Sequence, residues 1–178
     1  METLAYWRIS SSPVGPLLLA ASERGLALLE FDRGVFPSRN RYFEGASWKE
    51  SRSKLRPVVG ELEQYFAGLR REFSFSLDLR GTEFQRRCWQ ALLDISYGKT
   101  RSYAEIARVV GQPRAFRAVG MANHDNPVAI VVPCHRVIAS DGTLGGYGGG
   151  LQTKRWLLQL EGVQFEPQMK LFCVAGIA

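Results

Sequence analysis

Residues 102–123 read SYAEIARVVGQPRAFRAVGMAN, and this stretch decides the fold expected for the second half of the chain. Ser102 and Glu105 form an S-x-x-E capping box, which is typical of a helix N-terminus. Gly111 then interrupts the helical pattern, and Pro113 is placed to begin a second helix that ends near residue 123. Two short helices joined by a tight turn that contains glycine predict a helix-turn-helix.

A second capping box lies upstream of this stretch. Thr82 and Gln85 have the T-x-x-Q spacing, which predicts a further helix that ends near Asp94. The character of the sequence changes just before this box, at Arg80-Gly81. We therefore expect two domains, residues 1–80 and residues 81–178, the second of them mainly helical with a short wing.

The first domain begins with signals of a sheet. Two short apolar runs at residues 15–21 and 25–31 are separated by the turn residues Ser22-Glu-Arg24, which predicts a hairpin. Residues 32–53 are polar and lack a periodic apolar pattern, so they are predicted to form a loop.

One helix and one further strand follow. Apolar residues recur at helical spacing over residues 54–69, and Pro57 is expected in the first turn of that helix. Residues 73–79 alternate between apolar and polar, which is typical of a strand. The fold class is therefore α/β, with a small sheet and a helix in the N-terminal domain.

The composition favours a polyanionic partner, although a basic surface also serves solubility. The 178-residue chain has a net charge of +6. Residues 1–80 carry 12 basic and 10 acidic side chains, a net +2, and residues 81–178 carry 11 and 7, a net +4. A basic second half is suited to contacts with phosphate groups. No signal peptide or membrane span is recognisable, so a cytoplasmic protein without membrane contact is expected.

The three cysteines do not form a disulfide framework, because one must stay unpaired and no CxxC motif occurs. Cys134 ends an apolar run, residues 128–132, that is predicted to be a buried strand. His135 and Arg136 follow it directly, and nearby cations favour the nucleophilic thiolate. A buried, inert cysteine remains the alternative. Cys88 and Cys173 are interpreted as core residues.

The predicted second helix of the helix-turn-helix has the features of a surface that contacts DNA. Arg114, Arg117 and Met121 share one face, and Gly120 with three alanines keeps the helix slim. The minor groove is about 6 Å wide, so a helix lying against it must be lean. A solvated arginine on a core helix remains the alternative. His124, near the end of this helix, is interpreted as a surface or phosphate-facing residue.

The glycine-rich stretch 142–150 lacks the features of a nucleotide-binding loop, since no Gly-Lys-Ser/Thr follows it. Close approach of its backbone to a ligand, with Tyr147 as the one large side chain, is the simpler interpretation. The histidines and cysteines have no zinc-ligand spacing, so no metal is expected.

Taken together, these motifs resemble the O6-alkylguanine-DNA alkyltransferase family. The resemblance extends over nearly all of residues 82–162. It rests on segments that retain the family pattern: Gly98-Lys-Thr-Arg-Ser-Tyr103, Arg117-Ala-Val-Gly120, Asn126-Pro127, Pro133-Cys-His-Arg-Val137, Gly146-Tyr-Gly-Gly-Gly150, Lys154, Trp156-Leu-Leu158 and Glu161-Gly162.

The resemblance implies irreversible, single-turnover transfer of an alkyl group from O6-alkylguanine in DNA to Cys134, without a cofactor. O4-alkylthymine is an open second substrate. His135 would act through a water as the base that forms the thiolate, Glu161 would orient His135, and Asn126 would hold the active-site turn. The family fold implies an RNase H-like N-terminal domain and a C-terminal winged helix-turn-helix.

The same resemblance implies how the base would be reached and held. Tyr103 would donate to the purine N3 and force the nucleotide out of the stack, and Arg117 would fill the space left behind. The carbonyl groups of Cys134 and Val137 would accept from the guanine amine. Tyr147 and the N–H of Gly148 would close over O6. Many relatives have serine where this chain has Gly148, so a roomier pocket is expected.

The expected partner is double-stranded DNA that contains the alkylated base, bound through the minor groove by a monomer, with Arg117, Arg114 and Gly120 at the interface. Two other functions fit parts of the sequence. A non-catalytic protein that binds alkylated DNA would also use the helix-turn-helix, but it would not need Cys134. A cysteine hydrolase would use Cys134 and His135, although a base adjacent in sequence is unusual for such enzymes.

Overall fold

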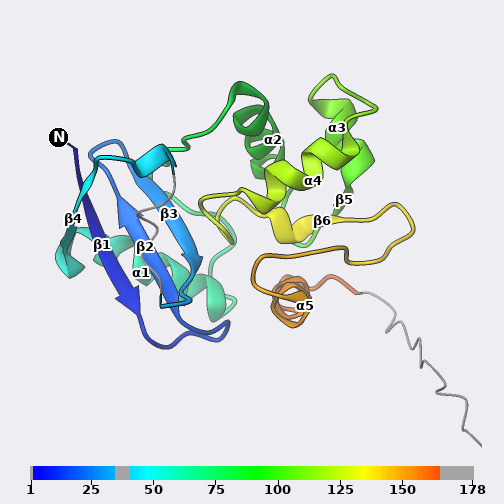
Figure 1. Cartoon of the computed structure of the whole chain (residues 1–178). Helices are drawn as coiled ribbons and strands as arrows, with labels where there is room; N and C mark the ends of the chain where they lie inside the picture. Colours follow the sequence, from blue (N-terminus) through cyan, green and yellow to red (C-terminus); the bar gives the residue numbers. More distant parts are fainter. Residues whose placement is uncertain (1, 35–40, 165–178) are drawn as a thin grey trace, which may run out of the picture.

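The computed structural model describes residues 2–34 and 41–164 and places them in two domains that pack together (Figure 1). The N-terminal domain is built on a four-stranded sheet with the order β3-β2-β1-β4, in which β1 and β4 are parallel and the other pairs antiparallel. The strands are β1 (Thr3–Ile9), β2 (Leu17–Ala21), β3 (Leu26–Phe31) and β4 (Ser47–Glu50).

The predicted hairpin of β2 and β3 is confirmed, and β2 is buried on both faces. Leu17 and Leu19 contribute to the large core that contains residues of helix α1 (Arg52–Phe66). Leu18 and Ala20 point to the opposite face, where they pack in a smaller cluster. Because successive strand residues face opposite sides, an all-apolar run is what a two-sided strand requires.

The sheet contains two strands, β1 and β4, that the sequence did not predict. Residues 32–53 are not simply a loop, because they contain the 3-10 helix η2 (Arg41–Phe43) and strand β4. Residues 35–40 of that segment lie outside the described part of the chain. Strand β4 has mostly polar, exposed residues, so only its pairing with β1 makes it a strand.

Two predictions for the rest of this domain need correction. Helix α1 begins at Arg52, with Ser51 as its N-cap, so Pro57 lies in the second turn and not the first. Residues 73–79 do not form a strand, because only Leu77 bridges to β3, at Leu26. The apolar residues of that segment still pack against the core, as the alternation indicated, but Asp78, expected on the outer face, is buried as well and is bound by Ser22 and Arg80.

The C-terminal domain is mainly helical, and both predicted capping boxes are present in it. Residues 101–102 and 137–138 form a short parallel pair of strands. The elements are α2 (Glu83–Leu93), β5 (Arg101–Ser102), α3 (Tyr103–Val109), α4 (Phe116–His124), the 3-10 helix η3 (Cys134–Arg136), β6 (Val137–Ile138) and α5 (Leu151–Leu160).

Helices α3 and α4 form the predicted helix-turn-helix, with Gly111 at positive φ in the turn. Helix α4 begins at Phe116 and not at Pro113. Arg114 therefore lies in the turn before the helix, and only Arg117 and Met121 share the predicted helical face. The prediction failed because Pro113 fits a turn as well as it fits a helix start.

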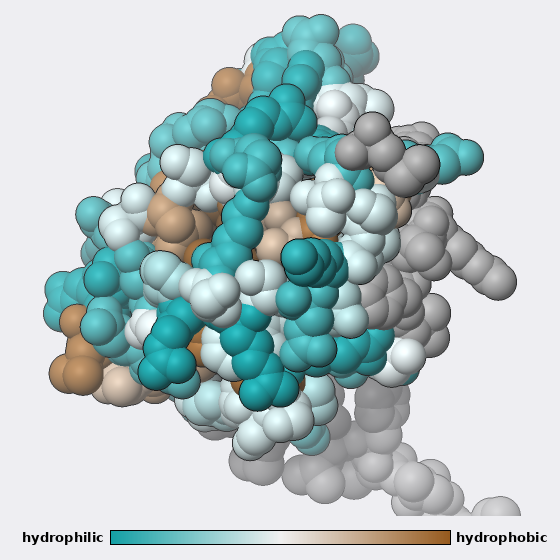
Figure 2. Space-filling view, turned by 90° about the vertical axis from the view of Figure 1, so that its left-hand side faces the viewer, coloured by the Kyte–Doolittle hydropathy of each residue, from teal (hydrophilic) through white to brown (hydrophobic). Residues whose placement is uncertain are grey.

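One hydrophobic core runs through both domains, since residues of β2, β3 and α1 pack in the same cluster as residues of α2, α4 and α5. The face on the N-terminal side is mostly hydrophilic, with small apolar areas between polar side chains (Figure 2). Within residues 2–34 and 41–164, no helix is long and apolar enough to cross a membrane.

Candidate active site around Cys134

The segment that leads to Cys134 is attached to the sheet of the N-terminal domain. The N–H of Leu29 in β3 donates to the carbonyl of Pro127 at 2.8 Å, and the N–H of Ala129 donates back to Leu29 at 2.8 Å. Residues 128–132 are buried except Ala129, but they make only isolated bridges, so the predicted strand is wrong. Ile130 has φ 73°, which turns the chain sharply before Cys134.

Asn126 closes this turn through three hydrogen bonds. Its amide nitrogen donates to the carbonyl of Val132 at 2.8 Å and to the thiol of Cys134 at 3.2 Å. Its oxygen accepts from the N–H of Val128 at 3.0 Å. The side chain expected to hold the turn is thus bound to both ends of it and to the sulfur.

Cys134 lies at the start of η3 and is 7% exposed. Burial raises the pKa of its thiol, whereas the hydrogen bond from Asn126 and the charge of Lys154 act in the opposite direction. The sequence had suggested that His135 and Arg136, which follow Cys134, would supply the cations that favour the thiolate. The structure corrects this, because Arg136 is bound to Glu161 and the cation acting on the sulfur is Lys154.

Lys154 on α5 is fully buried, and its ammonium group is surrounded by carbonyl oxygens. It donates to the carbonyl of Val137 at 2.6 Å and also to that of Leu144. Burial lowers the pKa of Lys154 to about 8. The carbonyl of Val137, predicted to bind the guanine amine, therefore already accepts a hydrogen bond from Lys154.

Glu161, at the C-cap of α5, is the centre of a buried cluster of donors. His135 Nε2 lies 3.0 Å from its Oε1, and Arg136 donates to both of its oxygens, from Nη2 at 2.8 Å and from Nε at 2.9 Å. The hydroxyl of Tyr65 donates to Oε1 at 2.7 Å. Burial raises the pKa of Glu161, but the hydrogen bonds from His135 and Arg136 outweigh it and bring the pKa down to about 2.

The other ring nitrogen of His135 is in different surroundings. Nδ1 of His135 is buried and has no hydrogen-bond partner in the described part of the chain, and the same is true of the hydroxyl of Tyr147. Burial lowers the pKa of His135, so the ring is neutral at neutral pH. Because Nε2 faces a carboxylate, the proton belongs on Nε2, and Nδ1 is left as an acceptor.

A cavity of about 510 Å³ lies next to the thiol and brings several predicted site residues together. Tyr103 is half-buried there, and burial raises the pKa of its hydroxyl, which is therefore protonated at neutral pH. The lining comes from α4, the start of α3, the glycine-rich loop and the N-terminal domain: Arg33, Tyr103, Gly120, Met121, Asn123, His124, Cys134, Gly146, Tyr147 and Gly148.

The two arginines predicted at the DNA interface lie outside this lining. Arg117 is exposed on α4, on the side that carries Met121, and its guanidinium lies over the ring of Phe116 at 6.0 Å. Arg114 is exposed in the preceding turn. Gly120 lies where α4 passes Tyr103, and an added Cβ would be 3.9 Å from that ring, so space is not what requires a glycine here.

Three residues of the site were assigned no role from the sequence, although one of them, Lys154, was among the residues of the family pattern. Tyr65 and Lys154 are distant along the chain from their partners, and nothing in their spacing connects them to a thiol or a carboxylate. Arg33 donates to the carbonyl of Gly148 at 2.8 Å, which ties the glycine-rich loop to the N-terminal domain. For Lys154 a usable signal existed, because a lysine among apolar residues of a helix is buried only when its charge is satisfied.

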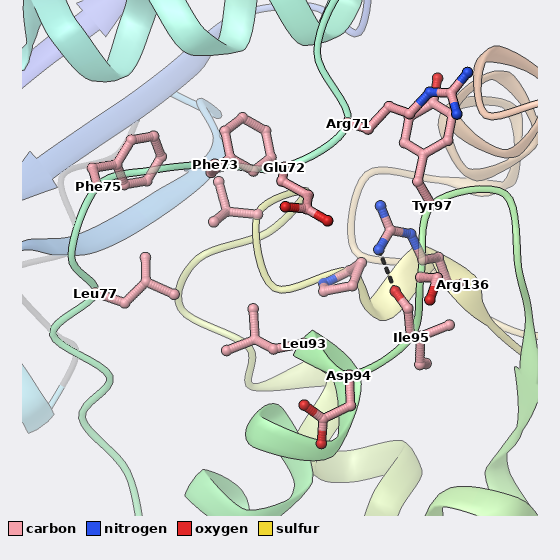
Figure 3. A pocket seen from close by; sticks show the side chains of 13 residues that line it. Arg71, Glu72, Phe73, Phe75, Leu77, Leu93, Asp94, Ile95, Tyr97 and Arg136 are labelled. Atoms are coloured by element: carbon pink, nitrogen blue, oxygen red, sulfur yellow. Dashed lines mark hydrogen bonds between the residues drawn. The ribbon is translucent and has the colours of Figure 1, made fainter.

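A second cavity of about 330 Å³ lies between the domains, on the other side of η3 (Figure 3). Arg136 crosses it and donates to the carbonyl of Ile95 at 2.5 Å. The guanidinium of Arg71 lies over one side of Tyr97 at 5.5 Å, and that of Arg136 lies 5.9 Å from the same ring. This cavity contacts the cluster around Glu161 and not the thiol.

Comparisons with known proteins agree with this arrangement. Residues 5–79 match the model of the 6-O-methylguanine DNA methyltransferase ribonuclease-like domain, and residues 83–163 match that of the 6-O-methylguanine DNA methyltransferase DNA binding domain. A methylated-DNA–protein-cysteine methyltransferase from Methanosarcina barkeri is 49% identical over 88% of this chain and 96% of its own.

Solved structures from Mycobacterium tuberculosis give the same result. The O6-methylguanine methyltransferase is 48% identical, with a TM-score of 0.79 over 95% of this chain and 99% of its own. A second structure, of OGT in complex with DNA, is 47% identical, with a TM-score of 0.76 over 88% of this chain and 92% of its own.

Proposed function

Since the chain belongs to the 6-O-methylguanine DNA methyltransferase family, we propose that Cys134 is the residue on which it receives the alkyl group. Its function is direct-reversal DNA repair, in which the methyl group of O6-methylguanine in DNA is transferred to a cysteine of the protein. The product is a thioether on saturated carbon, which water does not readily cleave. Each molecule therefore acts once.

The observation that carries the choice of Cys134 is that this residue lines the cavity, while the residue that follows it, His135, is held by Glu161. Glu161 engages Nε2 of His135, so Nδ1 is the nitrogen that can take the proton of the thiol, either directly or through one water. The thiolate then attacks the alkyl carbon: the S–C bond forms, the C–O6 bond breaks, and the electron pair moves to the guanine. Asn126 and Lys154 stabilise the negative sulfur.

The two tyrosines of the cavity fit the other half of the reaction. Tyr103 and Tyr147 are both protonated at neutral pH, since burial raises the pKa of each hydroxyl. Tyr103 would donate toward N3 of the guanine and so neutralise the leaving base. Tyr147 and the N–H of Gly148 would face O6, and the carbonyls of Cys134 and Val137 would accept from the exocyclic amine. No atom lies within 4 Å of a Cβ added at Gly148, which fits a roomy pocket that accepts alkyl groups larger than methyl.

The reacting oxygen cannot be reached inside a duplex, so the nucleotide must rotate out of the stack. We place α4 against the minor groove, with its exposed residues toward the DNA. Arg117 would occupy the space of the rotated base, Gly120 would permit close approach, and Arg114 would contact the backbone from the turn before the helix. A monomer suffices for this, because one chain supplies every group named.

Two further assignments complete the proposal. We place the domain boundary at Arg80-Gly81, between the two matched family models. We place the protein in the cytoplasm, a reducing compartment, because the thiols of Cys88 and Cys134 are both free.

A non-catalytic protein that binds alkylated DNA is the alternative function, and the curated relative does not favour it, since it is named a methyltransferase. A hydrolase would turn over repeatedly and would leave the thiol of Cys134 unmodified. Alkyl transfer leaves an alkyl group on the sulfur of Cys134, whereas both alternatives leave that sulfur unmodified, so the state of the sulfur distinguishes them.

The test is the intact mass of the protein after incubation with a short duplex that contains one O6-methylguanine. We expect a gain of one methyl group that saturates at one per molecule. Cys134→Ala should gain nothing and still bind the duplex. Cys88→Ala is the matched control, because its thiol is buried in the core with a pKa raised to about 11, and it should gain the methyl group as the wild type does. Tight binding of the lesion without a mass gain would contradict the proposal.

A further inference from the structure

Tyr65 connects the N-terminal domain directly to the carboxylate of Glu161, the partner of the proposed base. It lies on α1, is fully buried, and donates from its hydroxyl to Oε1 of Glu161 at 2.7 Å across 96 positions of the sequence. The side chain of Glu161 has no exposed surface either. Water therefore cannot replace the phenol as a donor without a rearrangement of the core.

The phenol shares its acceptor atom with the proposed base. Oε1 of Glu161 receives the hydroxyl of Tyr65 at 2.7 Å, Nη2 of Arg136 at 2.8 Å and Nε2 of His135 at 3.0 Å. Donors on one oxygen draw on the same negative charge, so a strong bond from Tyr65 leaves less of that charge for His135. The contact of Tyr65 with Oε1 is shorter than that of His135, although His135 is closer to Glu161 in the sequence.

The hydroxyl is held in place by a cluster of aromatic rings. The ring of Tyr65 packs against Phe73 at 5.4 Å, Phe66 at 5.7 Å and Tyr97 at 6.1 Å between centroids. Phe73 and Tyr97 also line the cavity between the domains, next to Arg136 (Figure 3). A ring that cannot rotate presents its hydroxyl to Glu161 in one geometry.

We propose that Tyr65 is a positioning residue of the alkyl transfer: through Oε1 of Glu161 it limits how strongly the carboxylate attracts the proton of His135. This inference rests on the proposed function. It gives the N-terminal domain a part in activating Cys134, although no residue of that domain is the base or the nucleophile. Tyr65 itself touches neither the thiol nor the cavity beside it.

The direction of the effect follows from the shared oxygen. Without the hydroxyl of Tyr65, Oε1 has one donor fewer, and more of its charge acts on His135. The charged form of His135 gains stability, so its pKa rises, and a larger fraction of the ring is protonated at neutral pH. The transfer rate then falls near neutrality and recovers toward higher pH, where His135 is neutral again.

The experiment is the single-turnover rate of methyl transfer over a series of pH values. For Tyr65→Phe we expect the midpoint of the acidic limb to move upward and the rate below both midpoints to fall by about three- to tenfold, tenfold corresponding to one pH unit. Replacing Tyr65 with 3-fluorotyrosine makes the phenol a stronger donor, so the midpoint should move downward. Opposite shifts are not expected from a purely structural role.

Tyr97→Phe is the matched control. It removes a hydroxyl from the same aromatic cluster, where that hydroxyl donates to the carbonyl of Leu160 at 2.9 Å and not to Glu161. Its pH profile should equal that of the wild type. In the Glu161→Gln background, Tyr65→Phe should have no additional effect on the midpoint, because the proposed route runs through the carboxylate.

A midpoint unchanged in Tyr65→Phe, with or without an equal loss of rate at every pH, would overturn the inference. If Tyr65→Phe does not fold, the 3-fluorotyrosine variant decides, and a midpoint equal to that of the wild type overturns the inference as well. A wild-type protein that transfers no methyl group would instead refute the proposed function, so the two failures are distinguishable.

Discussion

The cluster around Glu161 and the cavity beside Cys134 lie on either side of His135, whose ring contacts Glu161 and is 6.4 Å from the ring of Tyr147 in the cavity lining, but they differ in how their polar atoms are satisfied. On the Glu161 side, the carboxylate receives donors from Tyr65, His135 and Arg136, and every contact is within the protein. On the other side of the ring, Nδ1 of His135 is buried without a hydrogen-bond partner among the residues that the structure describes, and so is the hydroxyl of Tyr147, which lines the cavity.

This difference separates two tasks. A fully satisfied cluster is rigid and fixes the orientation and tautomer of the base before substrate arrives. Buried polar atoms without protein partners are unusual and are commonly satisfied by a ligand or a water. The first region prepares the base, and the second receives the reacting groups. Substitutions in the two regions should therefore have different consequences.

The largest effect is expected from Glu161→Gln, which removes the carboxylate at the centre of the fully satisfied cluster. The guanidinium of Arg136 would remain buried without its counter-charge, which costs about 3–5 kcal/mol in the free energy of unfolding. The transfer rate should fall by roughly a hundredfold as well, because His135 is no longer oriented by a carboxylate. Chemical denaturation and single-turnover kinetics measure the two effects.

Glu50→Gln is the control for that variant. Glu50 forms an exposed ion pair with Arg52 at 3.3 Å, and such pairs contribute about 0–1 kcal/mol. An equal loss of unfolding free energy in both variants would contradict the large contribution to stability expected of the cluster around Glu161.

Lys154→Met tests the charge that faces the thiol, and its effect depends on pH. Burial lowers the pKa of Lys154 from 10.5 to about 8, so the native state binds this proton less readily than the unfolded chain. The contribution to the free energy of unfolding that comes from this difference in proton binding is fully present above pH 10.5 and is lost as the pH falls to about 8. The free energy of unfolding of the wild type, relative to that of the variant, should fall by roughly 3 kcal/mol over this window.

Denaturation at both ends of that window measures this difference. A wild type and a variant whose stabilities change in parallel would show that Lys154 keeps an ordinary pKa. The variant should also form its thiolate at higher pH, because the charge of Lys154 favours the ionised sulfur.

Asn126→Ala affects the turn before Cys134 and the sulfur itself. It removes the hydrogen bonds to Val132, Val128 and the thiol, and leaving the buried N–H of Val128 unsatisfied costs about 1–3 kcal/mol. The pKa of Cys134 should rise, because the hydrogen bond from Asn126 acts to lower it. Absorbance of the thiolate during a pH titration measures this, with Cys134→Ala as the blank. An unchanged titration would remove Asn126 from the activation of the sulfur.

The smallest effect is expected from two neighbouring substitutions in the glycine-rich loop. A Cβ added at Gly149 would lie 2.5 Å from the ring of Phe31, whereas one added at Gly148 meets no atom within 4 Å. Gly149→Ala should therefore destabilise by about 1–3 kcal/mol, and Gly148→Ala by about 0.5 kcal/mol or less. Thermal unfolding measures both. Equal losses would mean that this loop does not pack against β3 as described.

The sequence predicted well those elements whose signals are local. The capping boxes at Thr82 and Ser102 act within one helical turn, so both helices begin where they were expected. The β2–β3 hairpin is equally local. Strand β4 and the bridges of Val128 and Leu77 depend on which distant segment supplies a partner, and nothing in their own residues contains that information.

The same distinction applies to the site. Cys134, His135 and Asn126 lie within one short stretch, and Glu161 was named only through the resemblance to the family. The adjacency of Arg136 to Cys134 was misleading, because neighbouring side chains of a 3-10 helix point in different directions. Tyr65, Lys154 and Arg33 reach the site only through tertiary packing. Pattern reasoning therefore found the nucleophile and missed the residues that tune it.

The most direct test of the account is the protonation state of His135 in the free protein, measured by nitrogen NMR on chains labelled at histidine. The chain contains 2 histidines, so a His124→Asn variant assigns both signals. The account predicts a neutral ring at neutral pH, with its proton on Nε2 toward Glu161 and Nδ1 without a proton. A proton on Nδ1, or a charged imidazolium at neutral pH, would contradict it, since neither form could accept the proton of Cys134 through Nδ1.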